Sequence, residues 1–147
     1  MTIKVTYFNN TSKTFETIEE CIAYPNYDDI KALYCANNNL NKLPMLPSKL
    51  VILDVEGNNL DSLPVLPDTL KYLYACRNKL TKLPNYLPSS LIELFVEYNK
   101  LSEIPNGIIN LNRKVYFYYT GNNIDIDNQI NSVKKWLYAN KVIMDGR

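Results

Sequence analysis

The sequence contains no histidine, and this absence restricts the chemistry that the chain can perform. Histidine is the commonest general acid or base in enzymes and the commonest metal ligand in proteins. The sequence also has no phosphate-binding glycine loop, no pairing of a nucleophile with a base, and no cluster of metal ligands. We therefore predict that the protein is not an enzyme and that it binds neither a cofactor nor a metal.

An excess of charge of one sign is also missing, because the 147 residues include 16 basic and 15 acidic side chains, for a net charge of +1. Proteins that bind nucleic acids derive much of their affinity from an excess of positive charge. Membrane-surface proteins commonly rely on a cluster of basic residues. No apolar run approaches the roughly 20 residues that a membrane helix needs. We expect neither a nucleic-acid partner nor a membrane partner.

Cysteine is scarce, since the chain has only Cys21, Cys35 and Cys76. An odd number without close pairing favours free thiols in a reducing compartment. The first ten residues lack the basic start and long apolar centre of a signal peptide. We expect a cytoplasmic protein; an effector exported by another route into the cytoplasm of a host cell would have the same features.

The sequence does contain a repeat, Leu-x-x-Leu-x-Val-x-x-Asn-x-Leu-x-x-Leu-Pro-x-Leu-Pro, which is clearest in residues 50–67. Successive copies are 20, 20, 21 and 23 residues apart, and they begin at Ile30, Leu50, Leu70, Leu91 and Lys114. In the last, degenerate copy the consensus positions are occupied by Phe117, Tyr119, Asn122 and Ile124. This pattern is the signature of the leucine-rich repeat. It predicts an α/β solenoid of about five repeats with a parallel sheet on its concave side.

The chemistry of each repeat predicts the local structure. Leu53 and Val55 alternate with Ile52, Asp54 and Glu56, a period of two that places the two sets on opposite faces of a short strand. The asparagine of each copy follows this strand, where its amide can donate to and accept from the backbone of a turn. The Leu-Pro segments have a fixed φ angle and lack some N–H donors, which favours an extended return path on the convex side.

The segments outside the repeats are predicted to cap the two ends of the solenoid, where an apolar edge would otherwise be exposed. Residues 1–29 are expected to form a β-hairpin and a short helix, because Thr17 and Glu20 resemble a capping box and Pro25 ends the helix. Residues 30–124 hold the repeats. Residues 125–147 are expected to form a capping helix over 127–140 and a tail, with Ile126, Ile130, Val133 and Leu137 on the buried face.

The outward positions of the strands would line the concave face, and aromatic side chains are frequent there. Aromatic residues and arginine are the side chains that most often anchor protein interfaces. Four carboxylates would surround them and favour a partner with basic and apolar side chains. The predicted binding residues are Tyr34, Asp54, Glu56, Tyr72, Tyr74, Arg77, Glu93, Phe95, Glu97, Tyr98, Tyr116 and Tyr118. The alternative is structural, because aromatic residues also favour strands and pair across them.

Two cysteines fall within the strand pattern. Cys35 occupies an inward position and is expected in the core. Cys76 is expected to be exposed beside Arg77, an arrangement that lowers the pKa of a thiol. Without a histidine to act as a base, we assign Cys76 no catalytic role.

The repeats of residues 30–124 resemble the short leucine-rich repeats of secreted bacterial effectors, and similar repeats occur in large DNA viruses such as insect poxviruses. The resemblance implies a module that binds a protein or peptide, in a virus or pathogen that acts on host machinery. Some bacterial relatives carry a ubiquitin-ligase domain with a catalytic cysteine, but no cysteine follows Cys76 here. The alternative function is a self-associating structural protein, a homodimer formed through the last strand, Tyr116–Tyr119, or through the concave face.

Overall fold

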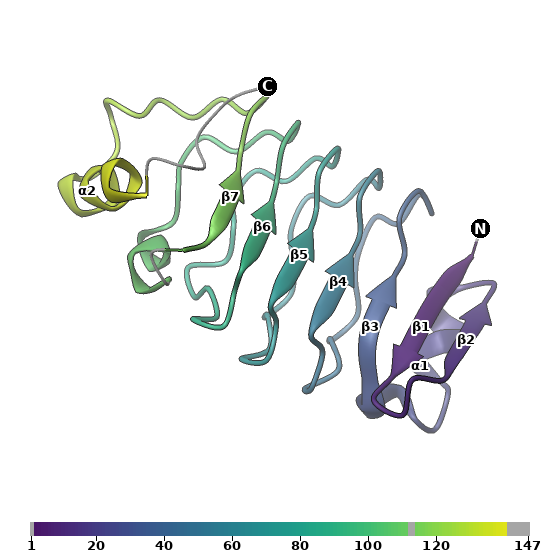
Figure 1. Cartoon of the computed structure of the whole chain (residues 1–147). Helices are drawn as coiled ribbons and strands as arrows, with labels where there is room; N and C mark the ends of the chain where they lie inside the picture. The colour runs from purple at the N-terminus through teal and green to yellow at the C-terminus, as the bar shows by residue number, and fades with distance from the viewer. Residues whose placement is uncertain (1, 112–113, 141–147) are drawn as a thin grey trace.

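The computed structural model describes residues 2–111 and 114–140, which form a solenoid with one continuous sheet on its concave side (Figure 1). The sheet has the strand order β2-β1-β3-β4-β5-β6-β7. The repeats contribute five parallel strands, and the N-terminal hairpin adds two antiparallel strands at one end. The structure therefore confirms the predicted solenoid and shows that its sheet extends beyond the repeats.

The strands of the repeats are short and lie in a constant register. Residues at the same position of neighbouring repeats pair with each other, so that Leu53 pairs with Leu73 and Leu73 with Leu94. A side-chain period of two places these leucines on the inner face of every strand. The strands are β3 (Ile30–Tyr34), β4 (Ile52–Asp54), β5 (Tyr72–Tyr74), β6 (Glu93–Phe95) and β7 (Tyr116–Tyr118).

The core is one stack of aliphatic side chains that runs the length of the coil. Leu53, Leu73 and Leu94 are fully buried, and Phe117 takes the same place in the last repeat. Burial of each such side chain stabilises the fold by roughly 1.5–3 kcal/mol. The degenerate fifth repeat keeps its place in the stack because an aromatic side chain substitutes for leucine there.

A column of asparagines (Asn38, Asn58, Asn78, Asn99 and Asn122) closes the turn after each strand. The Asn99 amide nitrogen donates to the carbonyl oxygens of Ala75 at 2.9 Å and Val96 at 3.0 Å. Its oxygen accepts from the Leu80 N–H at 3.0 Å. Each asparagine therefore joins its own turn to the preceding repeat, as the amide chemistry predicts.

The Leu-Pro segments return the chain along the convex side and end in a recurring turn. The Pro47 carbonyl accepts from the Leu50 N–H at 3.1 Å, and the Pro67 carbonyl accepts from the Leu70 N–H at 3.0 Å. This bond brings the chain back to the start of the next strand. The 23-residue copy differs, because its linker contains the 3₁₀ helix η2 (Asn106–Asn110) with Ile108 buried.

The N-terminal segment forms β1 (Ile3–Tyr7), β2 (Ser12–Phe15), α1 (Ile18–Ile22) and a 3₁₀ helix, η1 (Tyr27–Asp29). β1 pairs antiparallel with both β2 and β3. The Thr17 hydroxyl accepts from the Glu20 N–H at 3.2 Å, as the capping-box pattern predicts. The Asn38 side-chain oxygen accepts from the Thr2 N–H, and the Asn38 amide nitrogen donates to the Thr2 carbonyl oxygen. The segment of β1 therefore takes the place of a preceding repeat.

The C-terminal helix begins later than predicted, since α2 spans Asn131–Ala139 instead of starting at residue 127. The Asp125 carboxylate accepts from the Asp127 N–H at 3.0 Å and from the Asn128 amide at 2.6 Å. Such local side-chain bonds compete with the helix. The prediction for Ile130 is also wrong, because it precedes the helix and is 50% exposed.

α2 lies beside η2 at the end of the coil (Figure 1). Its buried residues are Val133 and Leu137, as predicted, together with Trp136. The Trp136 ring lies edge-on to Phe117 with centroids 6.5 Å apart, so it contacts the last side chain of the core stack. The expected tail, residues 141–147, lies outside the described residues.

Candidate functional site

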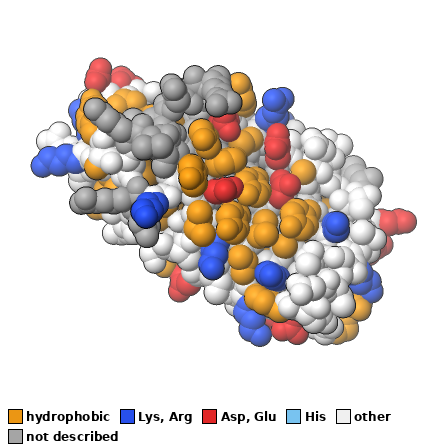
Figure 2. Space-filling view, in the orientation of Figure 1, with side chains coloured by type: hydrophobic (Ala, Val, Ile, Leu, Met, Phe, Trp, Pro, Cys, Tyr) orange, Lys and Arg blue, Asp and Glu red, His pale blue; other side chains and the backbone are white. Residues whose placement is uncertain are grey.

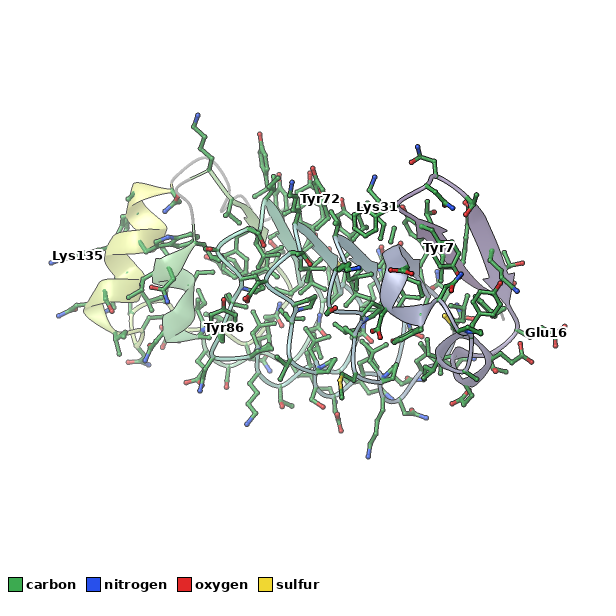
Figure 3. All side chains as sticks on the ribbon, turned by 90° about the horizontal axis from the view of Figure 1, so that it is seen from below. Tyr7, Glu16, Lys31, Tyr72, Tyr86 and Lys135 are labelled. Atoms are coloured by element: carbon green, nitrogen blue, oxygen red, sulfur yellow. The ribbon has the colours of Figure 1, made fainter. Side chains whose placement is uncertain are left out.

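The outward side chains of the sheet form two long columns on the concave face. The first contains Ala32, Ile52, Tyr72, Glu93 and Tyr116, and the second contains Tyr34, Asp54, Tyr74, Phe95 and Tyr118. The predicted alignment of these positions is confirmed by the strand register. Figure 2 shows hydrophobic side chains gathered over the middle of the sheet, with carboxylates among them. Figure 3 shows Tyr72 on the sheet side of the coil and Tyr86 among the connecting loops.

The second column contains a continuous aromatic row across β5, β6 and β7. The Phe95 ring lies edge-on to Tyr74 at 5.3 Å and to Tyr118 at 4.7 Å between centroids. Edge-to-face pairs at this distance are favourable beyond the area they bury. Neighbouring strands, about 4.8 Å apart, bring three rings from distant parts of the sequence together. All three side chains remain partly exposed to solvent.

Carboxylates lie beside this row and have defined partners. The Tyr74 hydroxyl donates to Glu93 at 2.6 Å, across neighbouring strands. Burial and this hydrogen bond raise the pKa of Tyr74, so its hydroxyl stays protonated at neutral pH. Asp54 accepts from the Glu56 N–H at 3.1 Å. The face therefore presents acceptors and negative charge next to aromatic surface.

The ends of the strands carry a third set of predicted residues. The Arg77 guanidinium lies 3.5 Å from the Glu56 carboxylate and 5.4 Å from the centroid of the Tyr98 ring. All three side chains belong to different repeats. Arg77 and Tyr98 are exposed, and the ion pair is open to solvent, so it contributes little to stability.

Sequence reasoning missed the backbone at this position, which adopts a left-handed conformation in every repeat. The φ angles of Arg77 and Tyr98 are both 55°, and those of Gly57 and Gly121 are 67° and 73°. Only glycine adopts this region without strain. The two glycines at the same repeat position are the signal that could have revealed it. A Cβ atom on Gly121 would lie 2.6 Å from the Tyr98 ring, so glycine leaves room for that ring.

The expectation for Cys76 is wrong, because its side chain is buried and only 8% exposed. Its thiol lies 3.7 Å from the Glu97 carboxylate instead of facing a cation. Burial raises the pKa of the Cys76 thiol to about 12, which is the opposite of activation. Cys35 is fully buried in the core, as predicted.

The structure brings most of the predicted residues together but separates Tyr34 from the aromatic row, because Asp54 stands between them. Sequence reasoning also missed the contribution of the hairpin. Lys4 pairs with Tyr34, and Thr6 pairs with Ala32, so β1 extends both columns. The alternation in Ile3-Lys4-Val5-Thr6 was the available signal, since it places Lys4 and Thr6 on the face opposite the core.

Residues 2–111 and 114–140 contain no group of three or more cysteine, aspartate or glutamate side chains that could hold a metal ion. Within the same ranges, no helix is both long and apolar enough to cross a membrane.

Among known proteins, the matches to this chain are solved structures. No family model matches the sequence, and no curated protein matches it. The leucine-rich-repeat domain of a Shigella effector is 34% identical to this chain, with a TM-score of 0.59 over 71% of this chain and 44% of that chain. The leucine-rich effector YopM of Yersinia pestis is 32% identical, with a TM-score of 0.53 over 65% of this chain and 26% of that chain.

YopM of Yersinia enterocolitica WA-314 gives similar values: 31% identity and a TM-score of 0.51, over 66% of this chain and 25% of that chain. The chain therefore spans less than half of the length of each of these solved structures. The matches support a role in protein–protein interaction, and they confirm the resemblance to bacterial effectors. The resemblance to viral proteins stays an expectation. The chain is a leucine-rich-repeat protein whose solenoid resembles those of bacterial effectors.

Proposed function

We propose that the protein is a non-enzymatic interaction module that binds a protein or peptide on its concave face. The observation that carries this proposal is the aromatic row of Tyr74, Phe95 and Tyr118, whose rings contact one another and remain partly exposed. A row of contacting rings is already ordered, so its side chains lose little freedom when a partner binds. Tyr72, Glu93 and Tyr116 lie in the neighbouring column of the same strands.

The charges around the row favour a partner with basic side chains. Four of the predicted residues are carboxylates (Asp54, Glu56, Glu93 and Glu97), and one is a cation, Arg77. Arg77 is already paired with Glu56. Complementary charge accelerates encounter and excludes acidic competitors. The proposed ligand therefore presents arginine or lysine together with aromatic or aliphatic side chains.

The proposed setting is the cytoplasm of a host cell. The solved structures that resemble this chain are bacterial effector domains, and this likeness supports a pathogen protein that acts on host machinery. The whole-protein activities of those longer chains are not transferred to this one.

The test is selection of binding peptides from a random library displayed on phage, followed by affinity measurement. A Tyr72→Ala, Tyr74→Ala, Phe95→Ala variant should lose binding to the selected peptides. The matched control replaces three exposed apolar residues of the connecting loops by alanine, namely Met45, Val65 and Tyr86. Circular dichroism and thermal melting would verify the fold of both variants.

Peptides enriched in arginine or lysine with an aromatic neighbour would support the proposal, provided that only the concave variant loses them. Affinity should also fall as salt concentration rises, because the attraction to the carboxylates is screened. If the loop variant loses binding while the concave variant retains it, the binding surface is on the convex side and the proposal is wrong.

Self-association is a second candidate function, favoured by the position of β7. Among the described strands, β7 is the last of the sheet and pairs only with β6. An unpaired strand edge can add a strand from another molecule. Light scattering over a range of concentrations would test this idea: a mass that doubles, and returns to that of a monomer when Tyr116→Lys places a charge on the exposed side of this edge strand, would support homodimerisation.

A further inference from the structure

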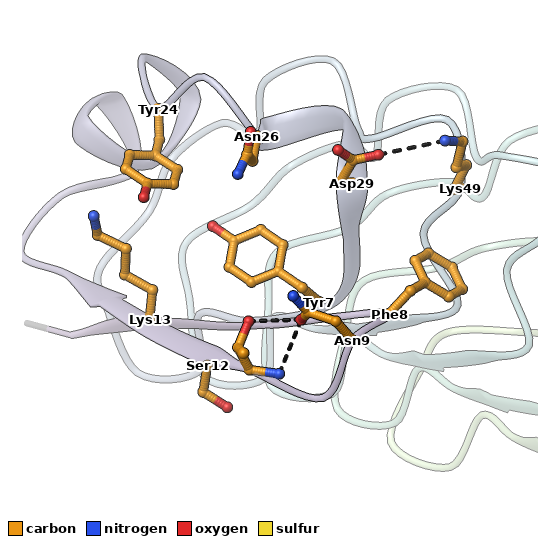
Figure 4. A pocket seen from close by; sticks show the side chains of 10 residues that line it. Tyr7, Phe8, Asn9, Ser12, Lys13, Tyr24, Asn26, Asp29 and Lys49 are labelled. Atoms are coloured by element: carbon orange, nitrogen blue, oxygen red, sulfur yellow. Dashed lines mark hydrogen bonds and ion pairs between the residues drawn. The ribbon is translucent and has the colours of Figure 1, made fainter.

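A pocket of about 560 Å³ lies at the N-terminal end of the coil, apart from the concave face (Figure 4). The β1–β2 hairpin forms one side, through Tyr7 and Lys13, and the segment after α1 forms another, through Tyr24 and Asn26. Tyr7 belongs to the inward row of β1, with Ile3 and Val5, so the pocket opens behind the sheet. Its volume lies in the range of small-molecule sites.

The Tyr7 hydroxyl is an unused polar group in this pocket. The side chain is only 9% exposed, and within the described ranges its hydroxyl has no hydrogen-bond partner. An unpaired buried polar group costs free energy, and phenylalanine would fill the same space without this cost. Burial, followed by the nearby Tyr24 and Cys21, raises the pKa of Tyr7, so the hydroxyl keeps its proton and can donate it.

Lys13 gives the pocket a free positive charge. Its ammonium lies 3.6 Å from the centroid of the Tyr24 ring and 5.4 Å from that of Phe15, and these contacts hold it in place. In the described part of the chain, no carboxylate lies within ion-pair distance of it. The other cation of the lining, Lys49, is paired with Asp29 at 3.4 Å.

Two acceptors of the lining, Asn9 and Asp29, already have partners. The Asn9 side-chain oxygen accepts from the Thr11 N–H at 3.0 Å and from the Thr11 hydroxyl at 2.6 Å. Asp29 accepts from Lys49. Figure 4 shows the Tyr7 hydroxyl directed into the space between Lys13, Tyr24 and Asn26. The pocket therefore offers donors and one free cation between aromatic walls.

We propose that this pocket binds a carboxylate attached to an aromatic or aliphatic body. The carboxylate accepts from the Tyr7 hydroxyl and pairs with the Lys13 ammonium, and the apolar body extends from there along the pocket toward Phe8. The same chemistry occurs in a free organic acid and in the C-terminal carboxylate of a peptide. The site is independent of the concave face, so neither proposal depends on the other.

The experiment titrates the full chain, labelled with ¹⁵N, with millimolar N-acetyl-phenylalanine and with its primary amide, which has the same shape but no charge. A second pair consists of a short peptide that ends in phenylalanine with a free carboxylate and the same peptide with an amidated terminus. Amide shifts confined to residues 7–13 and 24–29 are expected with the acids. If only the acid peptide causes them, the ligand is a peptide terminus; if the free acid suffices, it is a small molecule.

Three variants decide whether the proposed groups are responsible. Tyr7→Phe should weaken binding of the acid about fivefold to tenfold, the effect of one lost hydrogen bond, while the protein remains at least as resistant to heat. Lys13→Gln should remove most of the preference for acid over amide. Lys82→Gln, at an exposed position in a repeat, should change neither. Equal binding of acid and amide, unchanged affinity in Tyr7→Phe, or no shifts with any ligand would overturn the proposal.

Discussion

Replacing Asn78 by alanine tests whether the asparagine column holds the turns of the coil together. The Asn78 oxygen accepts from the Leu60 N–H at 3.0 Å. Its nitrogen donates to the carbonyl oxygens of Val55 at 2.9 Å, Cys76 at 3.1 Å and Ala75 at 3.3 Å. The side chain is buried, so water cannot easily replace these bonds.

The expected cost follows from which partners remain without Asn78. Val55 keeps a hydrogen bond from Asn58, and Cys76 keeps one from the Gly57 N–H. The Leu60 N–H, in contrast, loses its acceptor inside the core, at a cost of about 1–3 kcal/mol. The loss of the two amide donors adds about 0.5–1.5 kcal/mol each. We expect a total near 3 kcal/mol, which for a chain of this size lowers the Tm by roughly 6–12 °C.

The assay is thermal and urea unfolding of Asn78→Ala beside Asn41→Ala, which removes the same atoms from an exposed position. Asn41→Ala should change the free energy of unfolding by less than about 0.5 kcal/mol. Hydrogen exchange adds a local readout, because the Leu60 amide should exchange faster in the Asn78 variant than its neighbours do. Equal stability of the two variants would refute the idea that the column is structural, and the leucine stack would then suffice.

Three further predictions concern packing, pH and the aromatic row. Gly107→Ala should lower the free energy of unfolding by about 1–3 kcal/mol in urea titration, because the new Cβ would lie 2.0 Å from the Asn85 carbonyl oxygen. A double-mutant cycle with Phe95→Leu and Tyr118→Leu should give a coupling of about 0.5–1.5 kcal/mol, and zero coupling would contradict their contact. Stability should also fall as pH rises above 9, because burial raises the thiol pKa from 9.0 to about 11 or 12 and the unfolded chain ionises first. Urea midpoints measured from neutral to alkaline pH would show this loss of stability. Replacing Cys21, Cys35 and Cys76 by alanine should make the midpoint less dependent on pH.

The repeats could be predicted in detail because one rule acts at every copy. The same spacing that identifies Leu53 and Leu73 as core also aligns Asp54 with Tyr74 and Tyr74 with Phe95 on the opposite face. Alternation along a strand and pairing between strands are both local consequences of backbone geometry. The columns of the concave face therefore followed from the sequence, although their role in binding stays a prediction.

The errors occurred where the repeat rule ends or where a neighbour decides the outcome. The start of α2 depends on the Asp125 side chain, which bonds to the backbone and to Asn128 and so delays the helix. The burial of Cys76 depends on longer side chains in adjacent repeats, among them Glu97, which lies against its thiol. Helical periodicity and strand alternation carry no information about such contacts. The division into caps at 1–29 and 125–147 and repeats at 30–124 likewise stays a prediction.

The left-handed position at the end of each strand shows how these two kinds of information combine. The repeat requires the same backbone turn in every copy, so Arg77 and Tyr98 adopt it although each costs roughly 1–2 kcal/mol relative to glycine. Contacts made by the side chain can offset this cost when a residue other than glycine occupies the position. The Tyr98 ring lies against the backbone of Gly121 and beneath the Arg77 guanidinium, which also reaches Glu56. Three repeats thus meet at one edge of the concave face, and two of their residues have a strained backbone.

This backbone strain gives an independent reason to place Arg77 and Tyr98 in the proposed binding surface. Replacing both residues by glycine should stabilise the fold or leave its stability unchanged, and it should weaken the affinity for the partner. A purely structural role would not produce this combination.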